Sequence, residues 1–324
     1  MPLRETATRY AKQHLPPRAL DTIRSGRDRV QRALRPRSPL DEMPVEDFVT
    51  WAYRMVLRRE ADPAGRCHYE DELRTGAKTR RDVLDVMRGS EEFRFKVPFV
   101  DMNTSLHQSR CDFVRSLPRA RRIVDLGGTH QSSRQGAFVH LGYPYPFDEL
   151  TIIDLPHEER HEIYRHSEAV ERVETELGPV FYRYHSMTDL SLFPDETIDL
   201  VYAGQTIEHV TPADADVVMG EVRRILRPGG WFAFDTPNGP VCRMQQADFI
   251  NPDHKVEYSH QELAAKVTAS GLELVAAWGL NYLGHPAATV GFDPLEVAGN
   301  SGMYFEAGDC YLLAYVCRKS SRSG

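Results

Sequence analysis

The stretch Arg121–Gly136, RRIVDLGGTHQSSRQG, decides the fold class of this chain. Its first residues suit a buried strand, which runs directly into an acid, two adjacent glycines and a polar loop. A strand that ends in glycines allows another group to approach its backbone closely. The glycine spacing does not match the dinucleotide fingerprint G-x-G-x-x-G, so the stretch indicates a Rossmann-like sheet edge and leaves its ligand open.

From this stretch onward the chain alternates between apolar strands and helical segments such as ADADVVMGEVRRIL and SHQELAAKVTASG. Apolar strands separated by helices predict an α/β fold with a mostly parallel sheet and helices on both faces. The last strand follows its predecessor with no evident helix between them, so we expect it to run antiparallel. Seven strands are expected, at 121–126, 150–155, 180–186, 197–204, 231–236, 272–279 and 310–318.

The sequence before this region has two different compositions. Residues 1–40 hold ten Lys and Arg against three Asp and Glu, and prolines interrupt them. We expect a loosely ordered arm, or a basic segment that contacts an anionic membrane surface or an acidic partner. Residues 41–97 have helical periodicity and predict a small all-α domain, which leaves 98–324 for the α/β domain.

Local signals predict three short helices within 41–97. Apolar residues recur at helical spacing in PVEDFVTWAYRMVL. Asp62 is placed to cap a second helix that Gly76 ends, and Thr79 with Asp82 forms a capping-box-like pair before a third. The order Y-R-x-x-L-x-R-x-x-D-P-x-G, then G-S-E-E-F, resembles a small helical domain of unknown function. That domain is related to phycobilisome linkers and occurs beside bacterial glycan-modifying enzymes.

The overall composition excludes several classes of protein. The chain has 324 residues, of which 41% are hydrophobic and 27% charged, as is usual for soluble globular proteins. A net charge of -7 argues against nucleic acid as the main partner. Five scattered cysteines without a C-x-x-C pair are typical of a reducing compartment. The N-terminus lacks a signal-peptide core, so we expect a cytoplasmic protein.

Four features of the α/β region follow or precede predicted strands. In an open parallel sheet, ligands bind beyond the carboxyl ends of the strands, near a switch in strand order. A carboxylate at the end of the second strand, Asp154, is placed to accept the hydrogens of both ribose hydroxyls. The four features are Asp125–Thr129, Asp154, Gly204–His209 and Leu226–Gly230.

In this order and at this spacing, the four features resemble the class I S-adenosylmethionine-dependent methyltransferases over residues 105–318. The resemblance implies S-adenosylmethionine as the cofactor and a Rossmann-like fold. Thr129 departs from the family pattern, which has a glycine there, so its side chain is expected to contact the cofactor. The implied cofactor-binding residues are Asp125, Gly127, Gly128, Thr129, Asp154, Met187, Gly204 and Gln205.

Several of these residues also have purely structural interpretations. Asp125 could cap a helix or tie the loop, and Asp154 could form a turn at the end of its strand. Met187 could be an ordinary core residue. We expect Pro228-Gly229-Gly230 to form a turn rather than a cofactor contact.

Methyl transfer to a hydroxyl requires a group that removes the proton of the acceptor. His254 lies where related enzymes often carry a His beside the acceptor, and His209 follows the fourth strand. We expect His254 first, and His209 second, to be the catalytic base, although either could be a structural histidine. Glu208 is placed to orient the substrate or support a loop. Some sugar methyltransferases use a divalent cation, but no tight cluster of metal ligands is evident here, so the sequence names no metal ligand and leaves open whether a cation is needed.

The usual neighbours of the helical domain, with the polar segments 154–166 and 280–308, favour O-methylation of a sugar or glycan precursor. A lipid or other small-molecule acceptor is the alternative within the enzyme class. A non-catalytic cofactor-binding or scaffold protein stays open because of the altered glycine spacing. A nicotinamide oxidoreductase is disfavoured because its fingerprint is missing.

Overall fold

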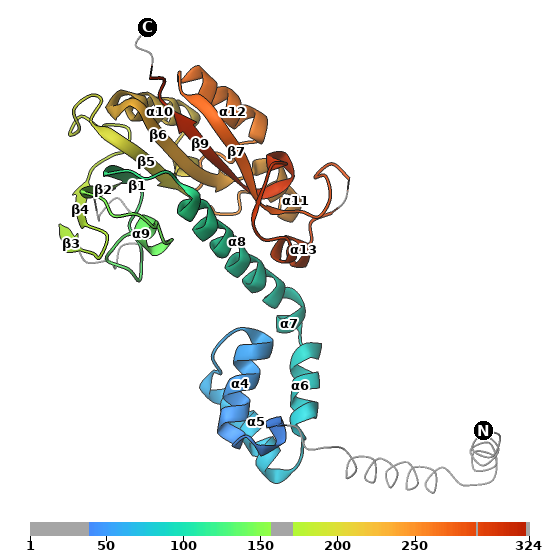
Figure 1. Cartoon of the computed structure of the whole chain (residues 1–324). Coiled ribbons are helices and arrows are strands. Elements are labelled where there is room, and N and C mark those ends of the chain that lie inside the picture. The colour runs from blue at the N-terminus through green and yellow to red at the C-terminus, as the bar shows by residue number, and fades with distance from the viewer. Residues whose placement is uncertain (1–38, 157–170, 290, 322–324) are drawn as a thin grey trace, which may run out of the picture. The chain divides into compact units, whose positions relative to one another are not determined.

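The computed structural model describes residues 39–156, 171–289 and 291–321 (Figure 1). The chain forms two compact units, of which the first ends at Arg94 and the second begins at Phe95. The predicted basic arm 1–40 lies outside the described residues except for its last two positions. Its contact with a membrane therefore stays a prediction. No helix in the described ranges combines the length and the apolar character that a membrane span requires.

The first unit is helical and has its own apolar core. Its helices are α3 Pro39–Glu42, α4 Val45–Leu57, α5 Pro63–Thr75 and α6 Arg80–Gly89, and α7 Glu91–Phe95 follows them. The core is formed by the apolar faces of α4 and α6, with Phe48, Val49, Val83 and Met87 buried in one cluster. The three predicted helices correspond to α4, α5 and α6.

The predicted helix ends of this unit are confirmed. Asp62 accepts a hydrogen bond from the backbone N–H of Gly65 at 2.8 Å, which satisfies a donor in the first turn of α5. Gly76 ends α5 in the left-handed region, with φ 74°. Thr79 and Asp82 form a complete capping box at the start of α6.

The second unit is built on one sheet, which has nine strands within the described residues, in the order β3-β4-β2-β1-β5-β6-β9-β7-β8. The strands β4, β2, β1, β5 and β6 are parallel, and β9 runs antiparallel to both of its neighbours, β6 and β7. The antiparallel last strand is thus confirmed. The strands are β1 Arg122–Leu126, β2 Glu149–Asp154, β3 Arg172–Glu174, β4 Pro179–Tyr184, β5 Ile198–Gly204, β6 Leu226–Pro237, β7 Glu273–Tyr282, β8 Met303–Tyr304 and β9 Cys310–Arg318.

This sheet has two strands more than the predicted seven. The additional strands, β3 and β8, lie at the two edges and have only three and two residues, none of them fully buried. They contain no apolar run, so no sequence pattern reveals them. The strand predicted at 231–236 begins earlier, at Leu226, because Leu226 pairs with Ile198 before the register shifts.

Helices cover both faces of the sheet, as predicted. The helices α8, α9, α11 and α13 contribute to one buried cluster, and α10 and α12 contribute to the other. Along β5 the side chains alternate between these two cores, with Leu200 and Tyr202 in the first and Val201 and Ala203 in the second. The helical elements are α8 Val97–Ser116, α9 Ala137–His140, η3 Ile207–His209, α10 Pro212–Ile225, α11 Gly239–Gln245, α12 His260–Ala269, α13 Pro294–Gly299 and η4 Ala307–Asp309.

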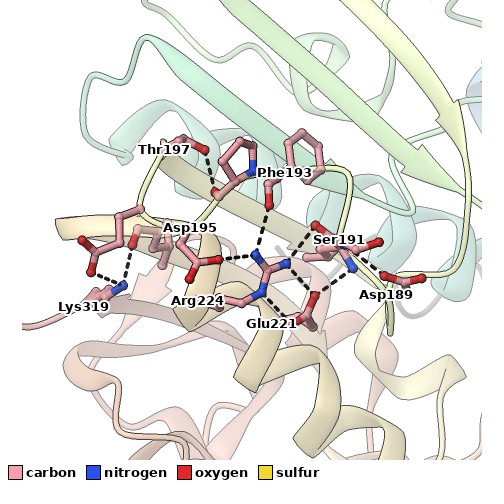
Figure 2. Close-up of polar contacts among 12 residues, drawn as sticks. Asp189, Ser191, Phe193, Asp195, Thr197, Glu221, Arg224 and Lys319 are labelled. Carbon is pink, nitrogen blue, oxygen red and sulfur yellow. Dashed lines mark hydrogen bonds and ion pairs between the residues drawn. The ribbon is translucent and has the colours of Figure 1, made fainter.

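Arg224, in the last turn of α10, holds the segment that leads into β5 (Figure 2). Its guanidinium donates to Asp195 at 2.7 Å, to Glu221 at 2.8 Å and to the carbonyl of Phe193 at 3.0 Å. A guanidinium offers five donors in a fixed fork, so one side chain can bind several acceptors at once. Because Asp195 precedes β5, this network stabilises the amino end of the strand.

The strand order reverses between β1 and β5. From β1 the chain builds β2 and β4 on one side, and from β5 it builds β6 on the other. In open parallel sheets, ligands bind at such a switch point beyond the carboxyl ends of the strands. The loop after β1 and the turn after β5 are therefore the segments that position the candidate site.

Candidate functional site

The two glycines after β1 are required by the packing of the protein itself. Gly127 has φ +72°, and a Cβ at this position would lie 2.7 Å from the side chain of Thr206. A Cβ on Gly128 would lie 2.0 Å from Oδ2 of Asp125. The N–H of Gly127 donates to the carbonyl of Ile153 at 2.7 Å, which ties the loop to the neighbouring strand β2. Neither position accepts a side chain without rearrangement.

Asp125 lies beneath this loop rather than on its surface. Its side chain is 1% exposed, and its Oδ2 accepts a hydrogen bond from the backbone N–H of Phe138 at 3.3 Å. Burial raises the pKa of the Asp125 carboxyl well above its ordinary value, and the nearby carboxylate of Asp154 raises it further. The structural interpretation of Asp125, as a residue that ties the loop to α9, therefore matches these contacts, and direct contact with the cofactor stays a prediction.

Thr129 and Asp154 lie at the carboxyl ends of the adjacent strands β1 and β2, where Leu126 pairs with Ile153. The hydroxyl oxygen of Thr129 is buried and has no hydrogen-bond partner in the described part of the chain. Asp154 is half-buried and accepts a hydrogen bond from the N–H of Leu155. Met187 is half-buried as well, and it packs against the core on the α10 side of the sheet. Its contact with a cofactor stays a prediction.

The turn after β5 is fixed by a buried carboxylate, Asp235 of β6. Gln205 has φ +56°, unusual for a residue other than glycine. Its side-chain amide donates to the Asp235 carboxylate at 2.8 Å, and its backbone N–H donates to the backbone carbonyl of Asp235 at 2.8 Å. The hydroxyl of Tyr202 donates to Asp235 at 2.5 Å, and Nε of Arg110 donates to it at 2.6 Å. A Cβ on Gly204 would lie 2.4 Å from the Tyr202 hydroxyl. Asp235 therefore determines the shape of the turn.

Asp235 and Arg110 are not among the residues predicted from the sequence. An acid within the otherwise apolar strand WFAFDTP is a usable signal for Asp235, because a buried charge requires a partner. No signal marks Arg110, which lies on α8 outside the four motifs.

A second group of polar residues gathers around η3. Glu208, His209 and His254 each offer a ligand atom, and these atoms lie within 4.8 Å of one another. The rings of His209 and His254 have centroids 4.9 Å apart and are nearly perpendicular. Oε2 of Glu208 accepts a hydrogen bond from the Thr236 hydroxyl at 2.9 Å, whereas its buried Oε1 has no hydrogen-bond partner among the described residues. Burial raises the pKa of Glu208 to about 8.

The His254 ring is held from one side by a carboxylate. Its Nδ1 lies 2.7 Å from Oε1 of Glu257, and Nδ1 carries the hydrogen because a carboxylate only accepts. Glu257 also accepts from the N–H of Ile250 at 2.9 Å and from Arg243 at 2.5 Å. Nε2 is therefore the ring nitrogen that is available for chemistry. Glu257 and Arg243 were not predicted from the sequence.

This cluster lies at the same edge of the sheet as the loop after β1. The hydroxyl of Thr206, just before η3, donates to the carbonyl of Leu126 at 3.0 Å. The N–H of Lys255 donates to the carbonyl of Glu208 at 2.8 Å, which brings the His254 segment to η3. The structure thus places the two predicted histidines together, next to the predicted cofactor loop. Burial lowers the pKa of His209, and the neighbouring His254 lowers it further.

Residues 145–234, which include β2, β4, β5 and η3, match the family described as a methyltransferase domain. This part of the chain is therefore similar to methyltransferase domains. Residues 41–97, upstream of it, match a domain of unknown function, DUF4214.

One protein of known sequence is also similar to part of this chain. A Mycolicibacterium smegmatis protein named "Probable S-adenosylmethionine-dependent methyltransferase" is 32% identical over 111 residues, which are 34% of this chain and 42% of that protein. The match thus spans less than half of the relative's length.

Solved structures of methyltransferases are also similar to this chain, and two of them illustrate the likeness. Their TM-scores are below 0.5, so the likeness carries no argument about function. A SAM-dependent methyltransferase of Thermotoga maritima has 19% identity and a TM-score of 0.45, and covers 70% of this chain and 95% of its own. A chain of the complex between the Trm112 methyltransferase activator and a methyltransferase of Haloferax volcanii has 16% identity and a TM-score of 0.47, with coverages of 70% and 96%.

The family match and the similar Mycolicibacterium smegmatis protein imply S-adenosylmethionine as the cofactor. The residues at the switch point fit this group. The buried Thr129 hydroxyl offers a hydrogen bond that the described residues do not use. Asp154 stands at the end of β2, where a ribose would bind.

Proposed function

We propose that the second unit transfers a methyl group from S-adenosylmethionine to a hydroxyl of a sugar or glycan precursor. S-adenosylmethionine supplies a methyl group that is already activated as a sulfonium. The chain has to align the acceptor and handle its proton. The observation that carries the proposal is the cluster of Glu208, His209 and His254, which lies beside the cofactor loop through the hydrogen bond between Thr206 and Leu126.

This cluster can handle the acceptor proton in two ways. Nε2 of His254 can accept the proton, because Glu257 holds the ring by its other nitrogen. Alternatively, Nε2 can bind a cation that lowers the pKa of the hydroxyl. In both cases the protein contributes a group that is fixed before the acceptor arrives.

An aromatic pair, formed by Trp278 of β7 and Phe305 after β8, supports a sugar as the acceptor. Phe305 is 80% exposed, and its ring lies 4.5 Å from the ring of Trp278, centroid to centroid. Asn238, which follows β6, donates to the carbonyl of Gly308 at 3.0 Å and so anchors the segment that carries Phe305. A sugar ring has an apolar face of C–H bonds that packs on an aromatic surface, while its hydroxyls remain available to polar groups.

The test is transfer of a labelled methyl group by the full chain. The acceptors are a panel of sugars and glycans, the same compounds with their hydroxyls acetylated as matched controls, and a set of amines and lipids. We expect label on the free sugars only, at an oxygen that mass spectrometry identifies. Label on amines alone would contradict a hydroxyl acceptor, and label on lipids would move the assignment to that class.

A separate measurement reports on the cofactor. The melting temperature of the chain with S-adenosylhomocysteine should rise even where no acceptor is known, because a ligand of the folded state stabilises it. A protein that binds S-adenosylhomocysteine and methylates none of the acceptors would favour a non-catalytic binding role.

A further inference from the structure

We propose that Glu208, His209 and His254 form a binding site for one divalent transition-metal ion, with Glu257 as the residue that positions His254. The proposal deepens the proposed function, on which its catalytic role rests, but cation binding itself can be measured without cofactor or acceptor. The three ligand atoms already lie within 4.8 Å of one another in the protein.

The first supporting observation is the incomplete hydrogen bonding of Glu208. Its side chain is fully buried, and Oε2 is bound to the Thr236 hydroxyl. Oε1 has no hydrogen-bond partner within the described ranges. One carboxylate oxygen of Glu208 lies within 4.8 Å of a ring nitrogen of each of the two histidines. An unpartnered buried carboxylate oxygen is unfavourable unless a ligand supplies the missing partner. A cation held by the two histidines would be that partner.

The second observation is that each imidazole is oriented through its ring by a neighbouring acceptor. Glu257 accepts from Nδ1 of His254, and the His209 ring makes a hydrogen bond with the backbone of Asp253. Metal-binding histidines nearly always donate their second ring N–H to a carboxylate or a backbone carbonyl, which fixes the ring and makes the other nitrogen a better ligand. Arg243, bound to Glu257, completes this outer layer.

The ligand types select the kind of cation. Two imidazole nitrogens and one carboxylate oxygen suit first-row transition ions such as Mn²⁺, Fe²⁺, Co²⁺ or Zn²⁺. Mg²⁺ and Ca²⁺ prefer sites made of oxygen atoms. Three protein ligands leave further positions of the cation open.

An acceptor hydroxyl at one of those positions has a lowered pKa, and its proton leaves to solvent. His254 is then a ligand rather than the base.

The chain offers an internal control in a second histidine group. The rings of His130 and His140 have centroids 4.1 Å apart, and those of His107 and His140 are 6.0 Å apart. This group lies on α8, α9 and the loop after β1. It tests whether a bound ion belongs to the proposed site or to any cluster of imidazoles.

The experiment uses the full chain after treatment with EDTA and titration with Co²⁺, whose visible absorption reports the coordinating atoms. We expect one Co²⁺ per chain. Glu208→Gln, His209→Ala and His254→Ala should each weaken binding by at least about 100-fold, and Glu257→Gln, which changes only the outer layer, by about 10–100-fold. Glu208→Gln retains the shape of the side chain and the acceptor for Thr236, so it keeps the test valid if a histidine variant fails to fold.

His130→Ala and His185→Ala are the matched controls and should leave binding unchanged. His185 lies 3.0 Å from Asp189 in an exposed pair, so it offers an imidazole beside a carboxylate, as the proposed site does, but at the surface of the protein. The cation site is wrong if the parent chain binds no Co²⁺, if binding survives all three ligand substitutions, or if His130→Ala abolishes it. A chain that binds S-adenosylhomocysteine but no Co²⁺ overturns this inference alone, whereas one that binds Co²⁺ but no S-adenosylhomocysteine overturns the proposed function.

Discussion

Substitution of Asp235 by alanine should destabilise the second unit strongly. The carboxylate is fully buried and accepts from Arg110 at 2.6 Å, from Tyr202 at 2.5 Å and from the Gln205 side chain at 2.8 Å. Removal of one partner from a buried ion pair leaves the other charge uncompensated and costs about 3–5 kcal/mol. In a unit of this size, each kcal/mol lowers the melting temperature by about 2–4 °C, so we expect a decrease of roughly 6–20 °C.

The measurement is urea unfolding of the full chain followed by circular dichroism. Asp148→Ala is the control, because Asp148 pairs with Arg121 at 2.8 Å between two exposed side chains, and such pairs contribute about 0–1 kcal/mol. The double variant Arg110→Ala, Asp235→Ala should lose less than the sum of the two single variants, since it leaves no unpaired charge. If Asp235→Ala costs no more than Asp148→Ala, or if the two losses simply add, the reasoning about the buried network is refuted.

Three further predictions concern the cofactor loop and the division of the chain. Gly128→Ala should lower the free energy of unfolding by about 1–3 kcal/mol and weaken S-adenosylhomocysteine binding, because its Cβ would lie 2.0 Å from Asp125. The control Gly220→Ala, in helix α10, should raise the free energy of unfolding by up to about 1 kcal/mol, and equal effects of the two substitutions would contradict this reasoning. Asp154→Ala should abolish the thermal stabilisation by S-adenosylhomocysteine, which is about 2.7 kcal/mol at 100-fold excess over Kd, and an unchanged shift would remove Asp154 from the ribose role. A fragment that begins at Phe95 should still bind S-adenosylhomocysteine in calorimetry, and a folded fragment without binding would show that the units depend on each other.

The sequence allowed most of the sheet to be predicted because its signals are local. The seven long strands are apolar runs, and each reappears in the structure within a few residues of the expected bounds, apart from the early start of β6. Likewise, Asp62 and Thr79 act on backbone groups within three positions of themselves, so their caps could be read directly. Edge strands such as β8 are too short and too exposed to leave a comparable pattern.

The supporting residues of the candidate site could not be predicted, for the opposite reason. Arg110 and Asp235 are 125 positions apart, and only the packing of α8 on the sheet brings them together. Glu208 lies in the Gly204–His209 motif and His254 lies outside all four motifs, so their spacing carries no metal-binding signal, although the fold places their ligand atoms within 4.8 Å of each other. Single residues at motif positions were identified, but the pairing between them depends on long-range contacts that no local pattern contains.

The position of β9 has a consequence for how this protein is made. The strand lies between β6 and β7, yet the ribosome synthesises it after both. Until Arg318 has left the exit tunnel, β6 and β7 each present an unpaired edge, and the places later occupied by the fully buried Leu313 and Ala314 are empty. Unpaired edges are the surfaces through which nascent chains aggregate. The second unit therefore completes its sheet only after synthesis of its last strand, and both edges stay open while the chain is being made.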